Sequence, residues 1–95
     1  MIHITGDCAE VSGPMTLSAA TVLLAEGEAA IAANASAFDF AAVTDMDSSC
    51  LAVVFGWTRA ANAAGKPLRL LNLPQNLLSL AAVYGVADLL PQHTV

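Results

Sequence analysis

Apolar and polar positions alternate in four short stretches of the chain, which predicts four β-strands. Alternation of this kind gives a sheet one apolar face, because successive side chains of a strand point to opposite faces. The predicted strands lie at residues 2–4, 8–11, 38–43 and 68–71. Gly6 and Asp7 form a turn between the first two strands, and Gly13 with Pro14 is predicted to end the second. A polar connection is expected after the third strand, at residues 44–47.

Alanine-rich stretches between these strands predict three helices, because alanine has the highest helix propensity and apolar residues recur there every three or four positions. The predicted helices cover residues 17–33, 49–64 and 74–84. Thr16 or Ser18 is expected to cap the first helix, and Gly65 and Gly85 are predicted to end the second and third. A short last turn is expected at residues 87–90.

The order of these elements, strand-strand-helix-strand-helix-strand-helix, predicts an α/β fold. Strands that are separated by a single helix pair in parallel through a right-handed crossover, and the opening hairpin adds one antiparallel pair. A small mixed β-sheet with helices packed against it is therefore expected. A chain of 95 residues is long enough for one domain and not for two, so residues 1–95 are predicted to form a single domain.

The composition is apolar for a domain of this size. Hydrophobic residues make up 57% of the chain and charged residues only 12%, with a mean hydropathy of +0.67. Soluble domains carry about 25% charged residues, so we expect a partner protein to cover part of this surface. The net charge is −5, and the basic residues are only Arg59, Lys66 and Arg69, which argues against binding to nucleic acid or to an anionic membrane surface.

The sequence shows neither a membrane span nor an export signal. The longest charge-free run, residues 70–87, contains Asn72, Pro74 and further polar positions, and the N-terminus lacks the basic and apolar regions of a signal peptide. A cytoplasmic location is therefore expected, with Cys8 and Cys50 as free thiols. The two cysteines have no metal-ligand spacing, so neither a metal site nor a cofactor is predicted.

No catalytic motif is evident, which predicts that the protein is not an enzyme. Nothing in the sequence places His3 or His93 beside a serine or cysteine, as a nucleophile and its base require. Three aspartates in the middle of the chain suggest a hard-cation site, but a calcium or magnesium loop needs tighter spacing and more oxygen ligands. A solvated loop beside a helix start is the preferred interpretation of Asp39, Asp45 and Asp47.

Residues 46–52 form the most distinctive segment, in which Asp47, Ser48 and Ser49 come directly before the second predicted helix. One interpretation is structural, because Asp or Ser at a helix start accepts hydrogen bonds from the free amides of the first turn. The other is functional: Ser48 is exposed at the positive end of the helix, where the same amides favour a phosphate or a polar group of a partner.

This arrangement of motifs resembles the STAS domain, the sulfate-transporter and anti-sigma-antagonist module. The resemblance is carried by Asp39-Phe40, Asp47-Ser48-Ser49 and the Gly65 turn before the fourth strand. The chain resembles more closely the MlaB-type STAS subunit of the Mla phospholipid-transport ABC system. The features shared with it are Thr5-Gly6-Asp7, Ser12-Gly13, Asp47-Ser48 running into Leu51-Ala52, Leu80-Ala81, Tyr84 and Leu89-Leu90-Pro91. Cys50 stands where anti-sigma antagonists usually have glycine, which weakens that interpretation more than the transporter one.

The resemblance implies a mixed sheet of about four to five strands with helices packed on one side, no catalysis, and docking on another protein through the helix that begins at Ser48. In the Mla system the implied partner is the cytoplasmic ATPase subunit, so the chain would be peripheral to the inner membrane. In the anti-sigma antagonists the residue matching Ser48 is phosphorylated by a kinase partner, which gives the alternative function. A small nucleotide-binding protein is a third hypothesis, disfavoured because no Gly-rich phosphate loop is present.

The second predicted helix suggests an interface of its own. At about 100° per residue, one side is expected to face the sheet, and it consists of Leu51, Val54, Phe55 and Thr58. The opposite side is also apolar, and an exposed apolar patch usually marks a binding site. The alternative is that another part of the chain covers it. The predicted partner-binding face consists of Ala52, Val53, Gly56, Trp57 and Ala60. Trp57→Lys is expected to leave the fold intact and to weaken partner binding.

Overall fold

The computed structural model describes residues 1–85, in which four strands form one mixed sheet. The strands are β1 (Ile2–Thr5), β2 (Cys8–Met15), β3 (Ala37–Met46) and β4 (Arg69–Leu71), and they lie side by side in that order. β1 pairs antiparallel with β2, whereas β2 with β3 and β3 with β4 pair in parallel. The mixed sheet predicted from the order of elements is therefore confirmed. The predicted turn at residues 87–90 lies outside the described residues.

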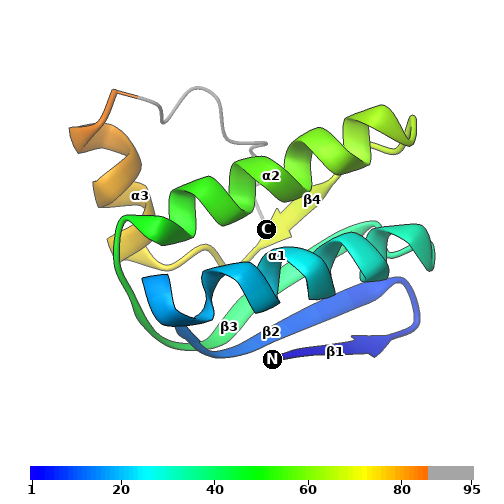
Figure 1. Ribbon diagram of the computed structural model, residues 1–95, viewed down its shortest axis with the longest axis horizontal. Coiled ribbons are helices and arrows are strands. Elements are labelled where there is room, and N and C mark those ends of the chain that lie inside the picture. The colour runs from blue at the N-terminus through cyan, green and yellow to red at the C-terminus, as the bar shows by residue number, and fades with distance from the viewer. Residues whose placement is uncertain (86–95) are drawn as a thin grey trace.

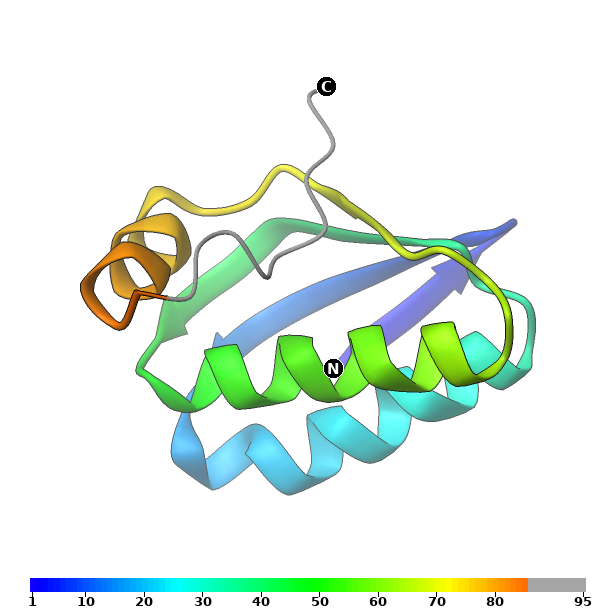
Figure 2. The ribbon, with the colours of Figure 1, turned by 90° about the horizontal axis from the view of Figure 1, so that it is seen from above.

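The helices of the described part are α1 (Leu17–Ala32), α2 (Ser49–Ala63) and α3 (Gln75–Val83), and each agrees with its predicted bounds within one residue at either end. α1 and α2 lie side by side over one face of the sheet, while α3 lies at the end of the sheet beside the first turns of α2 (Figures 1 and 2). Within residues 1–85, no helix has both the length and the apolar character that crossing a bilayer requires.

β2 and β3 extend further than the hydrophobic pattern predicts, at the same end of the sheet. β2 continues through Gly13 and Pro14, and β3 continues to Met46, so residues 44–46 are strand and not a polar connection. The reason is pairing between the two strands, which places Pro14 opposite Asp45. A register shift after Gly13 accommodates the irregularity. Pro14 lies beyond the part of β2 that pairs with β1, where a strand residue without an amide donor is tolerated.

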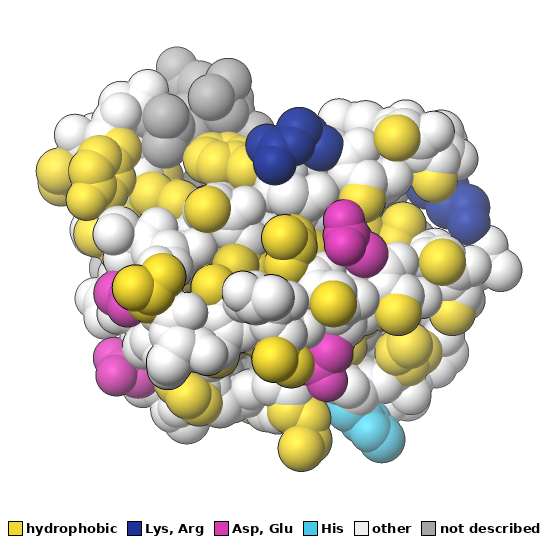
Figure 3. All heavy atoms as spheres, in the orientation of Figure 1, with side chains coloured by type: hydrophobic (Ala, Val, Ile, Leu, Met, Phe, Trp, Pro, Cys, Tyr) yellow, Lys and Arg dark blue, Asp and Glu magenta, His cyan; other side chains and the backbone are white. Residues whose placement is uncertain are grey.

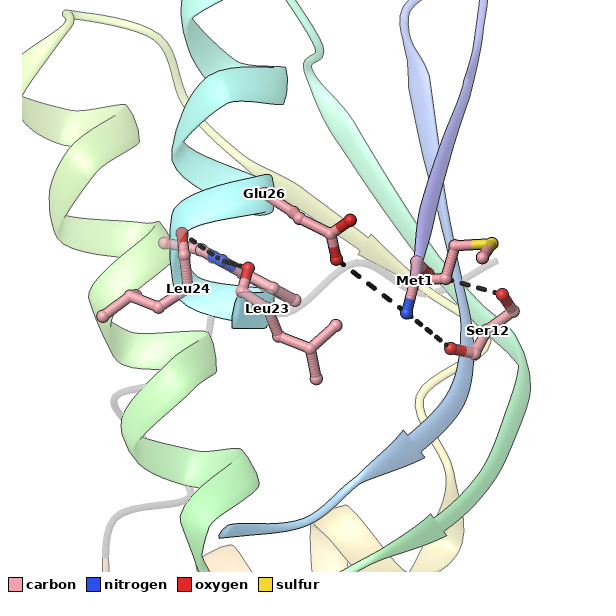
Figure 4. Close-up of polar contacts among 6 residues, drawn as sticks. Met1, Ser12, Leu23, Leu24 and Glu26 are labelled. Atoms are coloured by element: carbon pink, nitrogen blue, oxygen red, sulfur yellow. Dashed lines mark hydrogen bonds and ion pairs between the residues drawn. The ribbon is translucent and has the colours of Figure 1, made fainter. Parts of the chain in front are cut away.

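The core lies between the sheet and the two helices that cover it, with Trp57 of α2 at its centre. Trp57 is fully buried, and its ring centroid lies 4.6 Å from that of Phe38 and 6.3 Å from that of Phe40. Its indole Nε1 donates to the backbone oxygens of Leu23 (3.1 Å) and Leu24 (3.3 Å) in α1 (Figure 4). A buried tryptophan needs such an acceptor for its N–H group. The α1 backbone supplies it, so this side chain links both helices to the sheet.

Candidate functional site

The predicted residues Asp47, Ser48 and Ser49 lie where β3 ends and α2 begins. β2 and β3 run in parallel and end at the same edge of the sheet, so the helices that follow them, α1 and α2, both begin there. The first turn of a helix exposes free amides and carries partial positive charge. Two such helix starts therefore meet around one short loop. Open α/β sheets commonly bind ligands at the edge where their parallel strands end.

Asp47 holds this corner together. Its Oδ1 accepts a hydrogen bond from the backbone N of Ser49 (2.9 Å), and its Oδ2 accepts one from the backbone N of Leu17 (3.0 Å). One carboxylate thus caps the starts of α2 and α1 together. The Leu17 amide, followed by the Ser49 amide, lowers the pKa of the Asp47 carboxyl from its ordinary value, because both bonds favour the ionised form. Asp47 therefore remains negatively charged at neutral pH.

The hydroxyl groups that the sequence offers as caps do not act as caps. Thr16 occupies the N-cap position of α1, but its Oγ1 lies 3.2 Å from Oγ of Ser18 and makes no capping bond. Ser48 occupies the N-cap position of α2, also without a side-chain cap bond. The cause at Ser48 is its backbone, which is already helical (φ −63°, ψ −16°), whereas a capping side chain requires an extended residue. The Asp47 carboxylate caps both helices instead.

Ser48 is consequently available to a ligand or a partner. Its side chain is exposed, while those of Asp47 and Ser49 are half-buried. Its backbone oxygen accepts the Leu51 amide at 3.2 Å, which fixes the residue in the first turn of α2. Leu17, whose amide Asp47 binds, is 73% exposed and lies beside the same corner. The corner therefore presents a hydroxyl group on a rigid backbone next to an apolar side chain and a carboxylate.

A groove of about 490 Å³ opens beside Ser48, between the start of α2 and α3. Its walls consist of Met46, Asp47, Ser48, Asn76, Ser79, Leu80, Val83 and Tyr84. Val83 is 80% exposed and Tyr84 is 58% exposed, which is unusual for large apolar side chains. Hydrophobic side chains gather over α3 at this end of the molecule, with acidic side chains below them (Figure 3). Both sides of the groove are therefore mixed: α3 contributes Asn76 and Ser79 besides its apolar side chains, and Met46 lies beside Asp47 and Ser48.

Sequence reasoning missed the α3 side of this groove. Leu77 and Ala81, four residues apart, define the buried face of α3. Val83 lies two residues after Ala81 and falls off that face, because two residues turn a helix by about 200°. The signal in the sequence was therefore Val83, an apolar residue off the buried face of α3. The position of α3 beside Ser48 was not predictable, since it depends on how the chain packs after β4.

The predicted binding face of α2 is mostly buried within this chain. Val53 is 3% exposed and Trp57 is 0% exposed, and Gly56 is buried as well. The physical reason is α1, which packs along this side of α2 and supplies the acceptors for the indole of Trp57. The expectation that this face is free is therefore wrong for these three residues. Ala52 is exposed and Ala60 is half-buried, so these two remain at the surface.

The three aspartates of the middle segment do not converge on one point. Asp39 lies six residues before Asp45 in β3, which separates their backbones by about 20 Å. Its carboxylate accepts hydrogen bonds from Nδ2 of Asn72 (3.0 Å) and from the backbone N of Ala41 (2.9 Å). Within residues 1–85, no group of three His, Cys, Asp or Glu side chains is arranged to hold a metal ion.

Both cysteines are free thiols, as the sequence predicts. Cys50 is buried under the first turn of α2, and burial, followed by the negative charge of Asp47, raises the pKa of its thiol to about 11. Cys8 is half-buried, and burial is the first cause that raises its thiol pKa too. Both thiols are therefore protonated at neutral pH, and neither is an activated nucleophile.

Comparison with known families places this fold among the STAS domains. The sequence profile described as "Mlab, STAS domain" matches residues 3–91, which is nearly the whole chain. The chain therefore belongs to the MlaB-type family of STAS domains. STAS domains are in general non-catalytic binding or regulatory domains. Among curated protein sequences, none matches this chain.

Two solved structures share the fold. The Bacillus cell fate determinant SpoIIAA in its phosphorylated form is similar with a TM-score of 0.66 at 20% identity, over 99% of this chain and 90% of that chain. The anti-sigma factor antagonist SpoIIAA in its unphosphorylated form is similar with a TM-score of 0.64 at 19% identity, over 84% of this chain and 78% of that chain. The α/β STAS-like architecture predicted from the sequence is thus confirmed, while identities this low show the fold alone.

Proposed function

We propose that this chain is a non-catalytic STAS subunit that docks on the ATPase subunit of an Mla-type phospholipid ABC transporter and supports lipid transport between membranes. The observation that carries the proposal is the match of residues 3–91 to the MlaB-type family. On this proposal the chain works in the cytoplasm and is held at the inner membrane by its partner.

The docking surface is centred on Ser48. Ala52, four residues further on, is exposed and lies on the same side of α2, so a partner that reaches Ser48 also meets this small side chain. Leu17 adds an exposed apolar side chain from the start of α1. The surface lies on a corner that Asp47 holds rigid through two amides, so little conformational entropy is lost when a partner binds.

A negative charge at Ser48 has opposite consequences for folding and for docking. The amides at two helix starts tolerate a carboxylate, so Ser48→Asp is expected to leave the isolated chain folded. In a docked state the same charge is desolvated beside Asp47, which costs free energy unless the partner supplies a matching cation. Ser48→Ala removes a hydroxyl group that caps nothing, so it should change the unfolding free energy by less than about 0.5 kcal/mol.

The test uses the Mla-type ATPase subunit of the same organism, purified and titrated with the full chain by calorimetry. We expect wild type and Ser48→Ala to bind similarly, and Ser48→Asp to bind at least about tenfold more weakly. Asn62→Asp is the matched control, because it adds one negative charge at an exposed position near the far end of α2. Thermal unfolding of all four proteins checks the fold. The docking proposal fails if the wild-type chain does not bind the ATPase.

The alternative is an anti-sigma-factor antagonist that a partner kinase inactivates by phosphorylating Ser48. The observation that favours it is the exposed hydroxyl group of Ser48 at the start of α2, which no cap bond engages. Incubation of the full chain with the host's anti-sigma kinases and ATP, followed by mass spectrometry, would show one phosphoryl group at Ser48. If Ser48→Ala is modified as well as wild type, this alternative is wrong.

A further inference from the structure

Asp45 and Asp47, at the Ser48 end of the molecule, lie far from Lys66 and Arg69. Asp45 and Asp47 lie where β3 leads into α2, whereas Lys66 follows the far end of α2 and Arg69 pairs with the start of β3. The 15 residues of α2 span about 22 Å, which exceeds the screening length of about 8 Å at physiological salt. Figure 3 shows acidic side chains at the left and near the centre, and basic ones at the top and right. Lys66 and Arg69 therefore do not neutralise Asp45 and Asp47.

The groove beside Ser48 opens at this end of the molecule. Val83 and Tyr84 expose apolar surface on its α3 side, and Asp47 forms part of its other wall. Each carboxylate oxygen of Asp47 accepts one backbone hydrogen bond and keeps a lone pair for another donor. Asp45 is exposed, and its Oδ1 accepts only the amide of Met46 at 2.8 Å among the described residues. An occupant of the groove therefore also contacts the Asp47 carboxylate, and Asp45 lies two residues before it in the chain.

We propose, as a refinement that rests on the function proposed above, that this groove receives an apolar segment of the ATPase partner that carries a lysine or arginine facing Asp47, with Asp45 on the neighbouring surface. A purely apolar occupant would desolvate Asp47 without compensation, which is costly. A cation makes charge-assisted hydrogen bonds to the remaining lone pairs and removes that cost. The sign of the charge also excludes an anionic membrane surface as the occupant, because like charges would repel.

A pair of variants at Val83 tests the sign of the partner's charge. Val83 is 80% exposed, so both Val83→Lys and Val83→Glu should fold, and both remove the same apolar contact. We expect Val83→Lys to weaken binding of the purified ATPase subunit by at least about tenfold, because the new ammonium meets the partner's cation. Val83→Glu should weaken binding by no more than about threefold. Equal effects, or the reverse order, would overturn the proposal.

Asp45→Asn gives an independent measurement on the acidic rim. The asparagine oxygen can still accept the Met46 amide, so the fold keeps this bond while the charge is lost. Binding should weaken about threefold to tenfold and depend less on salt concentration. Glu28→Gln is the matched control, because it removes one exposed charge far along α1 and should leave the affinity unchanged. If both variants behave alike, the rim does not face a cation and the proposal is wrong.

The outcomes separate this inference from the docking proposal. If wild type binds the ATPase and Ser48→Asp abolishes binding, while the Val83 and Asp45 variants bind like wild type, docking stands and the groove assignment fails. If wild type does not bind, both fail together. Sedimentation of the isolated chain tests a second copy as occupant: a dimer that Val83→Lys dissociates would overturn the proposal. A lower Tm of both Val83 variants would do the same, since the chain itself would then cover Val83.

Discussion

Replacing Gly27 by alanine should destabilise the fold, because the added methyl group would occupy the place of the Trp57 indole. A Cβ at position 27 would lie 1.9 Å from Nε1 and 2.3 Å from Cε2 of that ring. The ring cannot move away freely, since it is fully buried and packs on Phe38 at 4.6 Å between centroids. Any shift also disturbs the hydrogen bonds from Nε1 to the backbone oxygens of Leu23 and Leu24.

The magnitude of the Gly27→Ala effect follows from three contributions. Alanine is favoured over glycine inside a helix by about 1 kcal/mol. Overpacking in a well-packed core costs about 1–3 kcal/mol, and a buried indole N–H that loses its acceptors costs about 1–3 kcal/mol more. The balance is a loss of about 1–5 kcal/mol, whose upper end is a large part of the roughly 5–15 kcal/mol that stabilises a domain.

Gly56→Ala is the matched control, because it makes the same substitution on the facing helix. Its Cβ would lie 2.6 Å from Cδ1 of Leu24, and the next atoms are 3.9 Å away. Cδ1 is the end of a flexible side chain and can rotate aside, so the helix propensity of alanine offsets the cost. We expect Gly56→Ala to remain within about 1 kcal/mol of wild type.

Urea unfolding followed by far-ultraviolet circular dichroism measures both variants on the same scale. A double variant, Gly27→Ala with Trp57→Phe, tests the cause, because the smaller ring leaves room for the methyl group. The double variant should be more stable than the sum of the single effects predicts, by at least about 1 kcal/mol. If Gly27→Ala is as stable as Gly56→Ala, or the two effects simply add, the indole does not limit the approach of α1 and α2.

Four further predictions concern charge and burial. The Leu17 and Ser49 amides lower the pKa of the Asp47 carboxyl, so the ionised carboxylate stabilises the fold fully above about pH 4. This contribution is lost as pH falls through the lowered pKa. The urea midpoint of Asp47→Asn should therefore lack this acid-dependent decrease. The pKa of the Cys50 thiol is raised to about 11, so the unfolding free energy should fall above about pH 9 as the thiol of the unfolded chain ionises. Cys50→Ala should reduce this decrease at alkaline pH. Mass spectrometry after iodoacetamide treatment should find Cys8 alkylated first, with Cys50 modified only through unfolding. The burial of Trp57 reverses the sequence-based expectation that Trp57→Lys leaves the fold intact: this variant should abolish cooperative unfolding, because it places an ammonium group in the core. A folded variant by circular dichroism would contradict this.

The order and bounds of the elements could be predicted because they depend on local pattern. The ends of β2 and β3 could not, since they depend on pairing between Pro14 and Asp45, which are distant in sequence. The same applies to Trp57. The apolar residues on both sides of its helix led to the prediction of a partner-binding face there, but the pattern does not say whether α1 or another protein covers the second side. The bond from Leu17 to the Asp47 carboxylate is equally non-local, so the local pattern offered Asp or Ser as the cap of α2 and did not predict that Asp47 also caps α1.

Because Asp47 and not Ser48 caps α2, a change at Ser48 can alter the surface without altering the fold. If Ser48 held the first turn of α2, any modification of its hydroxyl group would alter folding and docking together. Asp47 instead satisfies the amides of Ser49 and Leu17, and the side chain of Ser48 is exposed. A negative charge at Ser48 therefore changes the surface that a partner meets while the corner beneath it stays intact. Conversely, loss of the Asp47 carboxylate loosens two helix starts before it alters that surface. Neighbouring residues thus separate stability from recognition, which is the property that a regulated docking surface on a small domain requires.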